Sequence, residues 1–232
     1  MDFNGTKAPA PATLRTARDN LVFLYKWFVK FPQYRNRSLF ITGESYAGHY
    51  MPQPAELMLQ FNKKEKFFNL KGLALGNPVL EFATDFNSRA EFFWSHGLIS
   101  DPAYKLFTST CNYSRFVSEY YRGSVSQNCS RVMSLITKET SRFVDNILDY
   151  ELLDVETPTI SLVGKITKAG IPVLVYSGDQ DSVIPLTGSG TLVRGLMPVY
   201  EEVVLFFKVY WLRLNVFIAF GSLPRCCCLE SI

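Results

Sequence analysis

The chain has 232 residues, 47% of them apolar and 19% charged, which indicates a folded protein with a sizeable core rather than a disordered segment. Its formal net charge of +3 is too small and too evenly spread to indicate nucleic-acid binding. The length fits one ordinary domain, and the chain shows neither an internal repeat nor a clear second domain.

The N-terminal residues 1–15 are expected to form a loose tail, because prolines lie there in an alanine-rich stretch. Thr16 can cap a helix, and apolar residues recur at helical spacing after it. Pro32 disfavours helical geometry in the residue before it, so this first helix is predicted to end at Phe31.

Three short apolar segments predict strands, at residues 38–42, 69–76 and 171–176. The last of them is almost entirely apolar, as is typical of a parallel sheet that is covered on both faces. Because predicted helices alternate with these strands, the layout indicates an α/β fold.

A helix is predicted over residues 49–63, where Pro52 and Pro54 are tolerable only in the first turns. Another helix is predicted over 84–96. Residues 99–150 are polar and mixed in composition, and two or three further helices are expected there as an insertion.

The segment 43–48, Gly-Glu-Ser-Tyr-Ala-Gly, directly follows the first predicted strand and places Ser45 at the apex of a tight turn. A strand, a turn with a serine and then a helix form the nucleophile elbow of α/β-hydrolases, whose neighbouring residues must be small, here Gly43 and Ala47. The backbone N–H of Tyr46 would lie at the helix start, where it could stabilise an oxyanion. The short pattern alone also fits an ordinary helix N-terminus.

The longer string Gly-Glu-Ser-Tyr-Ala-Gly-His-Tyr at 43–50 is more specific, and it resembles the serine carboxypeptidase family, most closely its plant serine carboxypeptidase-like branch. Three further stretches support the resemblance: GLALGNP at 72–78, FFWSHGLI at 92–99 and YSGDQDSVIP at 176–185. The resemblance implies an α/β-hydrolase fold over residues 16–197. It also implies a truncated member in which N-terminal strands and a C-terminal histidine-bearing segment are missing.

By this resemblance, Ser45 is the acylating nucleophile and Asp181 is the triad aspartate. Asp181 follows a predicted strand, at the end where such sheets place catalytic groups. Asp179 is the alternative acid, and a polar turn is the structural alternative for both.

Glu44 corresponds to the glutamate that helps the family's carboxypeptidases to bind the substrate's terminal carboxylate. Two carboxyl groups can bind one another only if one holds a proton, which requires burial or a nearby like charge. The family's acyltransferases typically carry Asp at this position, so Glu44 favours a peptidase. A solvated glutamate at a helix N-terminus is the structural alternative.

The sequence departs from the family in three places. Nothing matches the family's N-terminal Asn-Gly-Gly-Pro-Gly-Cys-Ser-Ser motif, a longer family segment is absent after Asp145, and no histidine follows His96. His49 and His96 match non-catalytic positions of the family, so structural roles are expected for both. Because serine without a base is a weak nucleophile, we expect little or no activity from this chain.

Cysteines and glycosylation sequons bear on where the chain resides. Cys111 and Cys129 are a candidate disulfide pair, and Asn-x-Ser/Thr sequons occur at Asn4, Asn36, Asn112 and Asn128. These features favour the secreted or vacuolar location of the family. The first residues contain no apolar signal-peptide region, which favours a cytosolic location instead. The localisation therefore stays open.

The segment 198–232 is atypical for the family. Its apolar stretch 203–220 contains Lys208 and Arg213, which would be costly inside a bilayer, so a membrane span is not expected. Three cysteines at 226–228 suggest palmitoylation, whereas Leu229 at the fourth position from the end excludes prenylation. Alternatively, the segment 198–232 is the product of read-through or altered splicing.

The sequence therefore predicts a serine-type carboxypeptidase that acts on peptides, with no cofactor, no metal and no nucleic-acid partner, and with impaired activity in this chain. An acyltransferase that uses sugar-ester donors and a non-catalytic truncated product are the alternatives. The oligomeric state cannot be inferred from the sequence.

Overall fold

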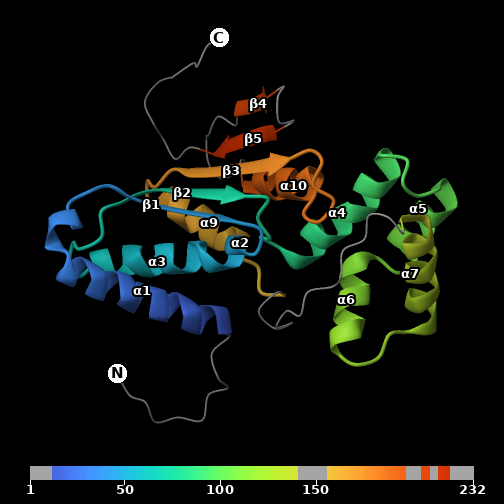
Figure 1. The fold of residues 1–232 in the computed structure, drawn as a ribbon, viewed down its shortest axis with the longest axis horizontal. Coiled ribbons are helices and arrows are strands. Elements are labelled where there is room, and N and C mark those ends of the chain that lie inside the picture. The colour runs from blue at the N-terminus through green and yellow to red at the C-terminus, as the bar shows by residue number, and fades with distance from the viewer. Residues whose placement is uncertain (1–11, 141–155, 197–204, 210–213, 220–232) are drawn as a thin grey trace.

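The structure is a computed structural model that describes residues 12–140, 156–196, 205–209 and 214–219. Its centre is a sheet with the strand order β1-β2-β3-β5-β4 (Figure 1). The strands are β1 (Leu39–Glu44), β2 (Leu70–Gly76), β3 (Val173–Gly178), β4 (Leu205–Val209) and β5 (Leu214–Ala219). The first three run parallel, whereas β5 is antiparallel to β3 and β4 is antiparallel to β5.

The three parallel strands lie where the apolar segments predict them. Leu73 of β2 lies opposite Val173 of β3, and Leu75 lies opposite Val175, and all four side chains are buried. Helices pack on this part of the sheet and extend its core with Ala55, Val163, Ile166 and Val193. The prediction of a covered parallel sheet is confirmed for β2 and β3.

Helices surround the sheet and fill the connections between strands. They are α1 (Ala12–Lys30), the 3-10 turn η1 (Pro32–Tyr34), α2 (Ala47–Tyr50), α3 (Pro52–Asn62), α4 (Phe82–Ser95), α5 (Asp101–Ser109), α6 (Tyr113–Tyr121), α7 (Gln127–Thr140), α9 (Ile160–Lys168) and α10 (Leu186–Leu196). In Figure 1, α1, α3 and α9 lie together below the sheet, and α10 packs against both β3 and α4.

The helices α5, α6 and α7 form a separate layer with α4. In Figure 1 they lie beyond the carboxyl ends of the parallel strands. Their own hydrophobic cluster includes Phe93, Phe107, Val117 and Ile136. The predicted insertion over residues 99–150 thus contains three helices within its described part, and residues 141–150 lie outside the described residues.

Three predicted boundaries were wrong. The first helix begins at Ala12, so Thr16 lies inside it and does not cap it. The predicted helix 49–63 is divided at Met51, because Pro52 has no N–H to donate and instead begins a new helix. The first strand continues through Glu44, so the turn begins only at Ser45.

The helices α9 and α10 and the strands β4 and β5 were missed by sequence reasoning. Both strands fall within the segment 198–232, which was expected to be an atypical tail, and they extend the sheet beyond β3. The cysteines 226–228 lie outside the described residues. Among the described helices, none combines the length and apolar character that a membrane crossing needs.

Candidate active site

Ser45 lies where β1 turns into α2, and its backbone has a φ of 59°. A positive φ is unusual for a residue with a side chain, and it persists only where neighbouring contacts hold it. Its N–H donates to Gly76 O over 2.9 Å, and its carbonyl accepts from Gly48 N–H and Val79 N–H at 3.0 Å each. The residue itself is exposed, so this turn presents the serine hydroxyl at the surface, as a nucleophile elbow requires.

The residues around the turn have to be small for steric reasons. A Cβ on Gly43 would collide with Cβ of Ala47, and a Cβ on Gly48 would collide with the backbone of Val79. The loop that follows β2 therefore packs directly against the helix that follows Ser45.

Asp181 lies in the loop after β3, and its carboxylate is engaged by the backbone. Its Oδ1 accepts from Val183 N–H over 2.7 Å and from Ile184 N–H over 3.0 Å. These bonds fix the side chain in a tight turn. The alternative acid, Asp179, has a buried Oδ1 with no hydrogen-bond partner in the described part of the chain.

Asn77 connects the two halves of the site, and sequence reasoning did not assign it a role. Its Nδ2 donates to Ser177 Oγ over 3.1 Å and to Ile184 O over 3.4 Å, and its Oδ1 accepts from Gly178 N–H over 3.3 Å. Its φ of 39° is positive, a conformation that asparagine tolerates better than most residues. The Gly-Asn-Pro turn after the predicted strand was the available signal.

Arg89 of α4 supports the same acid loop from the other side. Its Nε donates to Ser182 O over 3.0 Å, and its side chain is buried. The guanidinium lies over the ring of Tyr113, 4.4 Å from the centroid. A buried cation with these contacts fixes the carbonyl next to Asp181.

The sheet sets the spacing between Ser45 and Asp181. They follow β1 and β3, which lie on either side of β2, so the two strand ends are roughly 10 Å apart at one edge of the sheet. If the two side chains keep the spacing of these strand ends, they cannot share a proton directly. A group of the size of an imidazole would have to lie between them.

Both histidines of the chain are engaged by backbone carbonyls. His49 is fully buried, its Nδ1 donates to Val79 O over 2.8 Å, and its ring stacks on Tyr46. His96 follows α4, and its Nδ1 donates to Phe92 O over 2.9 Å. These are contacts of structural histidines, and no described contact joins either ring to Ser45 or Asp181.

Comparison with known proteins finds one family. Residues 4–156 match the sequence model of the serine carboxypeptidases. The chain belongs to the serine carboxypeptidase family. It is 57% identical to serine carboxypeptidase-like 45 and 56% identical to serine carboxypeptidase-like 46, both from Arabidopsis thaliana.

These matches cover 78% of the chain and 53% of each relative, so the chain spans about half the length of the relatives that it matches. Its fold resembles the crystal structure of Kex1(delta)p, a prohormone-processing carboxypeptidase from Saccharomyces cerevisiae, with a TM-score of 0.60 and 19% identity. That match covers 79% of the chain and 53% of the yeast chain. The fold is thus an incomplete α/β-hydrolase fold.

Two further residues predicted for a serine carboxypeptidase site flank Ser45. Tyr46 is the N-cap residue of α2, so its amide lies at the helix start, where an oxyanion site was expected. Glu44 ends β1 and is exposed, and the described residues offer its carboxylate no hydrogen bond or ion pair. The described residues therefore neither bury the Glu44 carboxylate nor pair with it.

Asp85, in the first turn of α4, is a buried acid that sequence reasoning missed. Its Oδ2 accepts from Leu80 N–H over 2.6 Å and from Glu81 N–H over 2.8 Å, while Oδ1 has no partner in the described part of the chain. Burial raises the pKa of Asp85 to about 7, although the two N–H donors act in the opposite direction.

Among the described residues, the disulfide and sequon candidates other than Asn36 lie in or near the helical layer. The structure joins Cys111 and Cys129 as a disulfide that links the end of α5 to the first turn of α7. Asn36 and Asn128 are exposed, whereas Asn112 caps α6 by accepting from Arg115 N–H. Glycosylation at these asparagines stays a prediction, and Asn4 lies outside the described residues.

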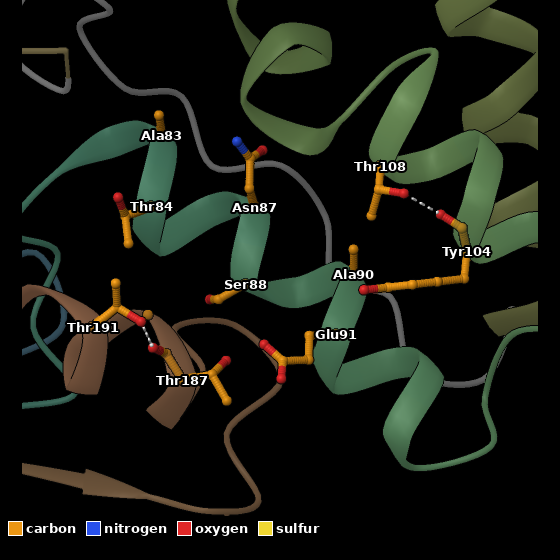
Figure 2. A pocket seen from close by; sticks show the side chains of 11 residues that line it. Ala83, Thr84, Asn87, Ser88, Ala90, Glu91, Tyr104, Thr108, Thr187 and Thr191 are labelled. Carbon is orange, nitrogen blue, oxygen red and sulfur yellow. Dashed lines mark hydrogen bonds between the residues drawn. The ribbon is translucent and has the colours of Figure 1, made fainter.

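A pocket of about 370 Å³ lies between α4, α5 and α10 (Figure 2), away from the predicted site residues. Three of its hydroxyl groups are engaged by their own helices: Ser88 donates to Asp85 O, Thr108 to Tyr104 O and Thr191 to Thr187 O. The Thr187 hydroxyl is buried and has no hydrogen-bond partner among the described residues. Neither Ser45 nor Asp181 lines it. We therefore place the candidate active site at the carboxyl edge of the parallel strands and not in this pocket.

Proposed function

We propose that the chain carries the nucleophile and the acid of a serine-type carboxypeptidase, which removes C-terminal residues from peptides through an acyl-enzyme on Ser45. The observation that supports this most directly is the strained backbone of Ser45, with a φ of 59° and hydrogen bonds to Gly76, Gly48 and Val79. A protein retains such strain where an exposed hydroxyl has to be presented.

The proposed chemistry follows from the roles of the groups at the sheet edge. The hydroxyl oxygen of Ser45 forms a bond to the last peptide carbonyl, and its proton passes to a base. The N–H of Tyr46 would stabilise the resulting oxyanion. The base then returns the proton to the leaving amine, and water hydrolyses the ester in a second, equivalent cycle.

Asp181 would orient the imidazole of that base from the opposite side of the gap, and Glu44 would help to bind the terminal carboxylate. The backbone donors of Val183 and Ile184 hold the Asp181 carboxylate in place for this role. A fixed carboxylate keeps an imidazole in the tautomer that accepts a proton from serine.

We also propose that the 232-residue chain by itself hydrolyses peptides poorly. It contains two histidines, and both donate Nδ1–H to backbone carbonyls, His49 to Val79 O and His96 to Phe92 O. Loss of the serine or the histidine from a comparable triad lowers turnover by on the order of 10⁶-fold.

The test compares the purified chain with its Ser45→Ala variant for release of the C-terminal residue from a blocked dipeptide at mildly acidic pH. Equal background rates are the expected result. Release that depends on Ser45 would contradict the proposed impairment and would demonstrate peptidase chemistry.

The carboxypeptidase assignment has its own test, which does not need turnover. The same blocked dipeptide should bind more tightly with a free C-terminal carboxylate than as its amide, and Glu44→Gln should reduce that difference while Glu65→Gln, at another exposed position, should not. Equal binding of the acid and the amide to the chain would count against a carboxypeptidase site.

A further inference from the structure

We propose that Asp85 is a positioning residue for Ser45: its carboxylate fixes the backbone segment 79–81, and this segment in turn holds the nucleophile elbow. The inference rests on the proposed function of Ser45. Asp85 itself has no described contact with Ser45, and it would act through backbone alone.

The first link joins the elbow to Val79. The N–H of Val79 donates to Ser45 O over 3.0 Å, and its carbonyl accepts from Nδ1 of His49 over 2.8 Å. Both polar groups of this residue are thus bound to the elbow and its helix. The close approach of Val79 to Gly48 leaves no room for the segment to move toward α2.

The second link joins the next two residues to Asp85. The N–H groups of Leu80 and Glu81 both donate to its Oδ2, over 2.6 Å and 2.8 Å. Since Val79, Leu80 and Glu81 are consecutive, a shift of the last two amides would also move the N–H that holds Ser45. The carboxylate therefore fixes the segment from its N–H side, while Thr159 N–H donates to Leu80 O over 2.8 Å on the carbonyl side.

The hydrogen bonds between Asp85 and this segment are buried. Asp85 and Leu80 are both 0% exposed, and α10 covers the acid so closely that a Cβ on Gly188 would lie 3.2 Å from Asp85 Cα. Water has no access that would let it replace the carboxylate as acceptor. Two buried N–H groups without a partner would destabilise this arrangement of the segment.

Simple capping of α4 does not account for Asp85, because a different side chain caps that helix. Glu81 accepts from Ala83 N–H over 3.0 Å and from Thr84 N–H over 2.7 Å, which are the first amides of α4. The bonds of Asp85 run backward, to amides that precede the helix. The side chain of Glu81 is thus a matched control: it is an acid with two backbone donors at the same helix end, and only the backbone N–H of Glu81 takes part in the link to Val79.

The experiment measures amide hydrogen exchange by NMR at Ser45, Gly48, Val79, Leu80 and Glu81 in the full chain. In the unmodified chain, Val79, Leu80 and Glu81 should exchange with one common free energy of opening, because they move as a unit. If Leu80 and Glu81 exchange through openings that leave Val79 protected, the proposal is overturned by the unmodified chain alone.

Three variants sharpen this test. Asp85→Ala should lower protection at Val79 and Gly48 by about tenfold, the effect expected when hydrogen bonds to a buried acceptor are lost. Asp85→Asn retains a carbonyl oxygen at the same place and should restore protection. Glu81→Ala, compared at a temperature that gives the same free energy of unfolding, should leave both amides protected.

Equal loss of protection in Asp85→Ala and Glu81→Ala would show a general effect of the helix end and would overturn the proposal, as would unchanged exchange in Asp85→Ala. Because exchange needs no turnover, the result is independent of the hydrolysis assays. Equal binding of the blocked dipeptide as acid and as amide would count against the proposed function, while these amides would still decide the role of Asp85.

Discussion

At the scale of single residues, Asn77 is the side chain that connects the strands of the candidate site. Asn77 joins β2 to the end of β3 and to the loop of Asp181 through three hydrogen bonds. We expect Asn77→Ala to lower the free energy of unfolding by about 2–3 kcal/mol, because buried partners lose their bonds. Urea unfolding followed by circular dichroism measures this.

The matched control for Asn77 is Asn69, which lies before β2 and makes one exposed hydrogen bond to Asn36 O. Asn69→Ala should change the free energy of unfolding by less than about 0.5 kcal/mol. A similar loss in both variants would mean that the contacts of Asn77 carry no special weight.

The glycine behind Ser45 allows a second comparison at this scale. Gly48→Ala would place a methyl group against the backbone of Val79, and we expect it to lower the free energy of unfolding by about 3 kcal/mol. Gly195, near the end of α10, has open space around its Cβ direction, so Gly195→Ala should be neutral or raise it by up to about 1 kcal/mol. Thermal denaturation that ranks the two variants in the opposite order would contradict the close packing of this loop.

At the scale of elements, the start of α4 holds two acids whose ionisation affects stability in opposite directions. Burial raises the pKa of Asp85 from 3.8 to about 7, so the folded state prefers its neutral form. Burial also acts to raise the pKa of Glu81, but hydrogen bonds from Thr84 and Ala83 outweigh it, so that pKa is lowered.

The sign of the Asp85 effect follows from proton binding. Between pH 4 and 7 the unfolded chain has lost this proton while the folded chain still holds it, so this group lowers the free energy of unfolding as the pH rises, by about 4 kcal/mol in all. Urea unfolding at several pH values measures the free energy of unfolding of the chain and of Asp85→Asn. The difference between the two at each pH gives the contribution of Asp85 titration. Glu81→Gln should change the slope in the opposite direction, and a pH-independent difference for Asp85→Asn would contradict its raised pKa.

Sequence patterns predicted the parallel strands well, because apolar runs such as 171–176 pair within the sheet, where Val173 and Val175 are buried and the residues between them are half-buried. The family resemblance predicted roles for Ser45 and Asp181, and the structure has both residues after strand ends, as the sequence indicated. The roles of Asn77 and Asp85 could not be read in the same way. Each depends on amides brought close only by folding, such as those of Gly178 and Leu80.

At the scale of the whole molecule, the helical layer of α4 to α7 is braced by the Cys111–Cys129 disulfide. The cysteines are 18 residues apart, and a crosslink of such length stabilises a fold by about 3 kcal/mol in the loop-entropy account. We expect the double variant Cys111→Ser with Cys129→Ser to melt at lower temperature than the oxidised chain. The oxidised chain after reduction should melt like the variant.

Counting free thiols before and after oxidative folding provides the control for this prediction. Oxidation should remove two thiols from the chain and none from the double variant. If reduction leaves the melting temperature unchanged, the disulfide does not stabilise the helical layer.

The division of the helical layer into buried and exposed side chains also matters for protein engineering. The buried residues of α5, α6 and α7 share one apolar cluster with Val79 and Ile184, whose N–H groups bind Ser45 and Asp181, whereas other side chains of these helices are exposed. Exposed positions of these three helices, such as Leu106 and Tyr120, can therefore be randomised in a selection library. Such a library would diversify the surface beyond the carboxyl ends of the strands while every clone inherits the same nucleophile geometry.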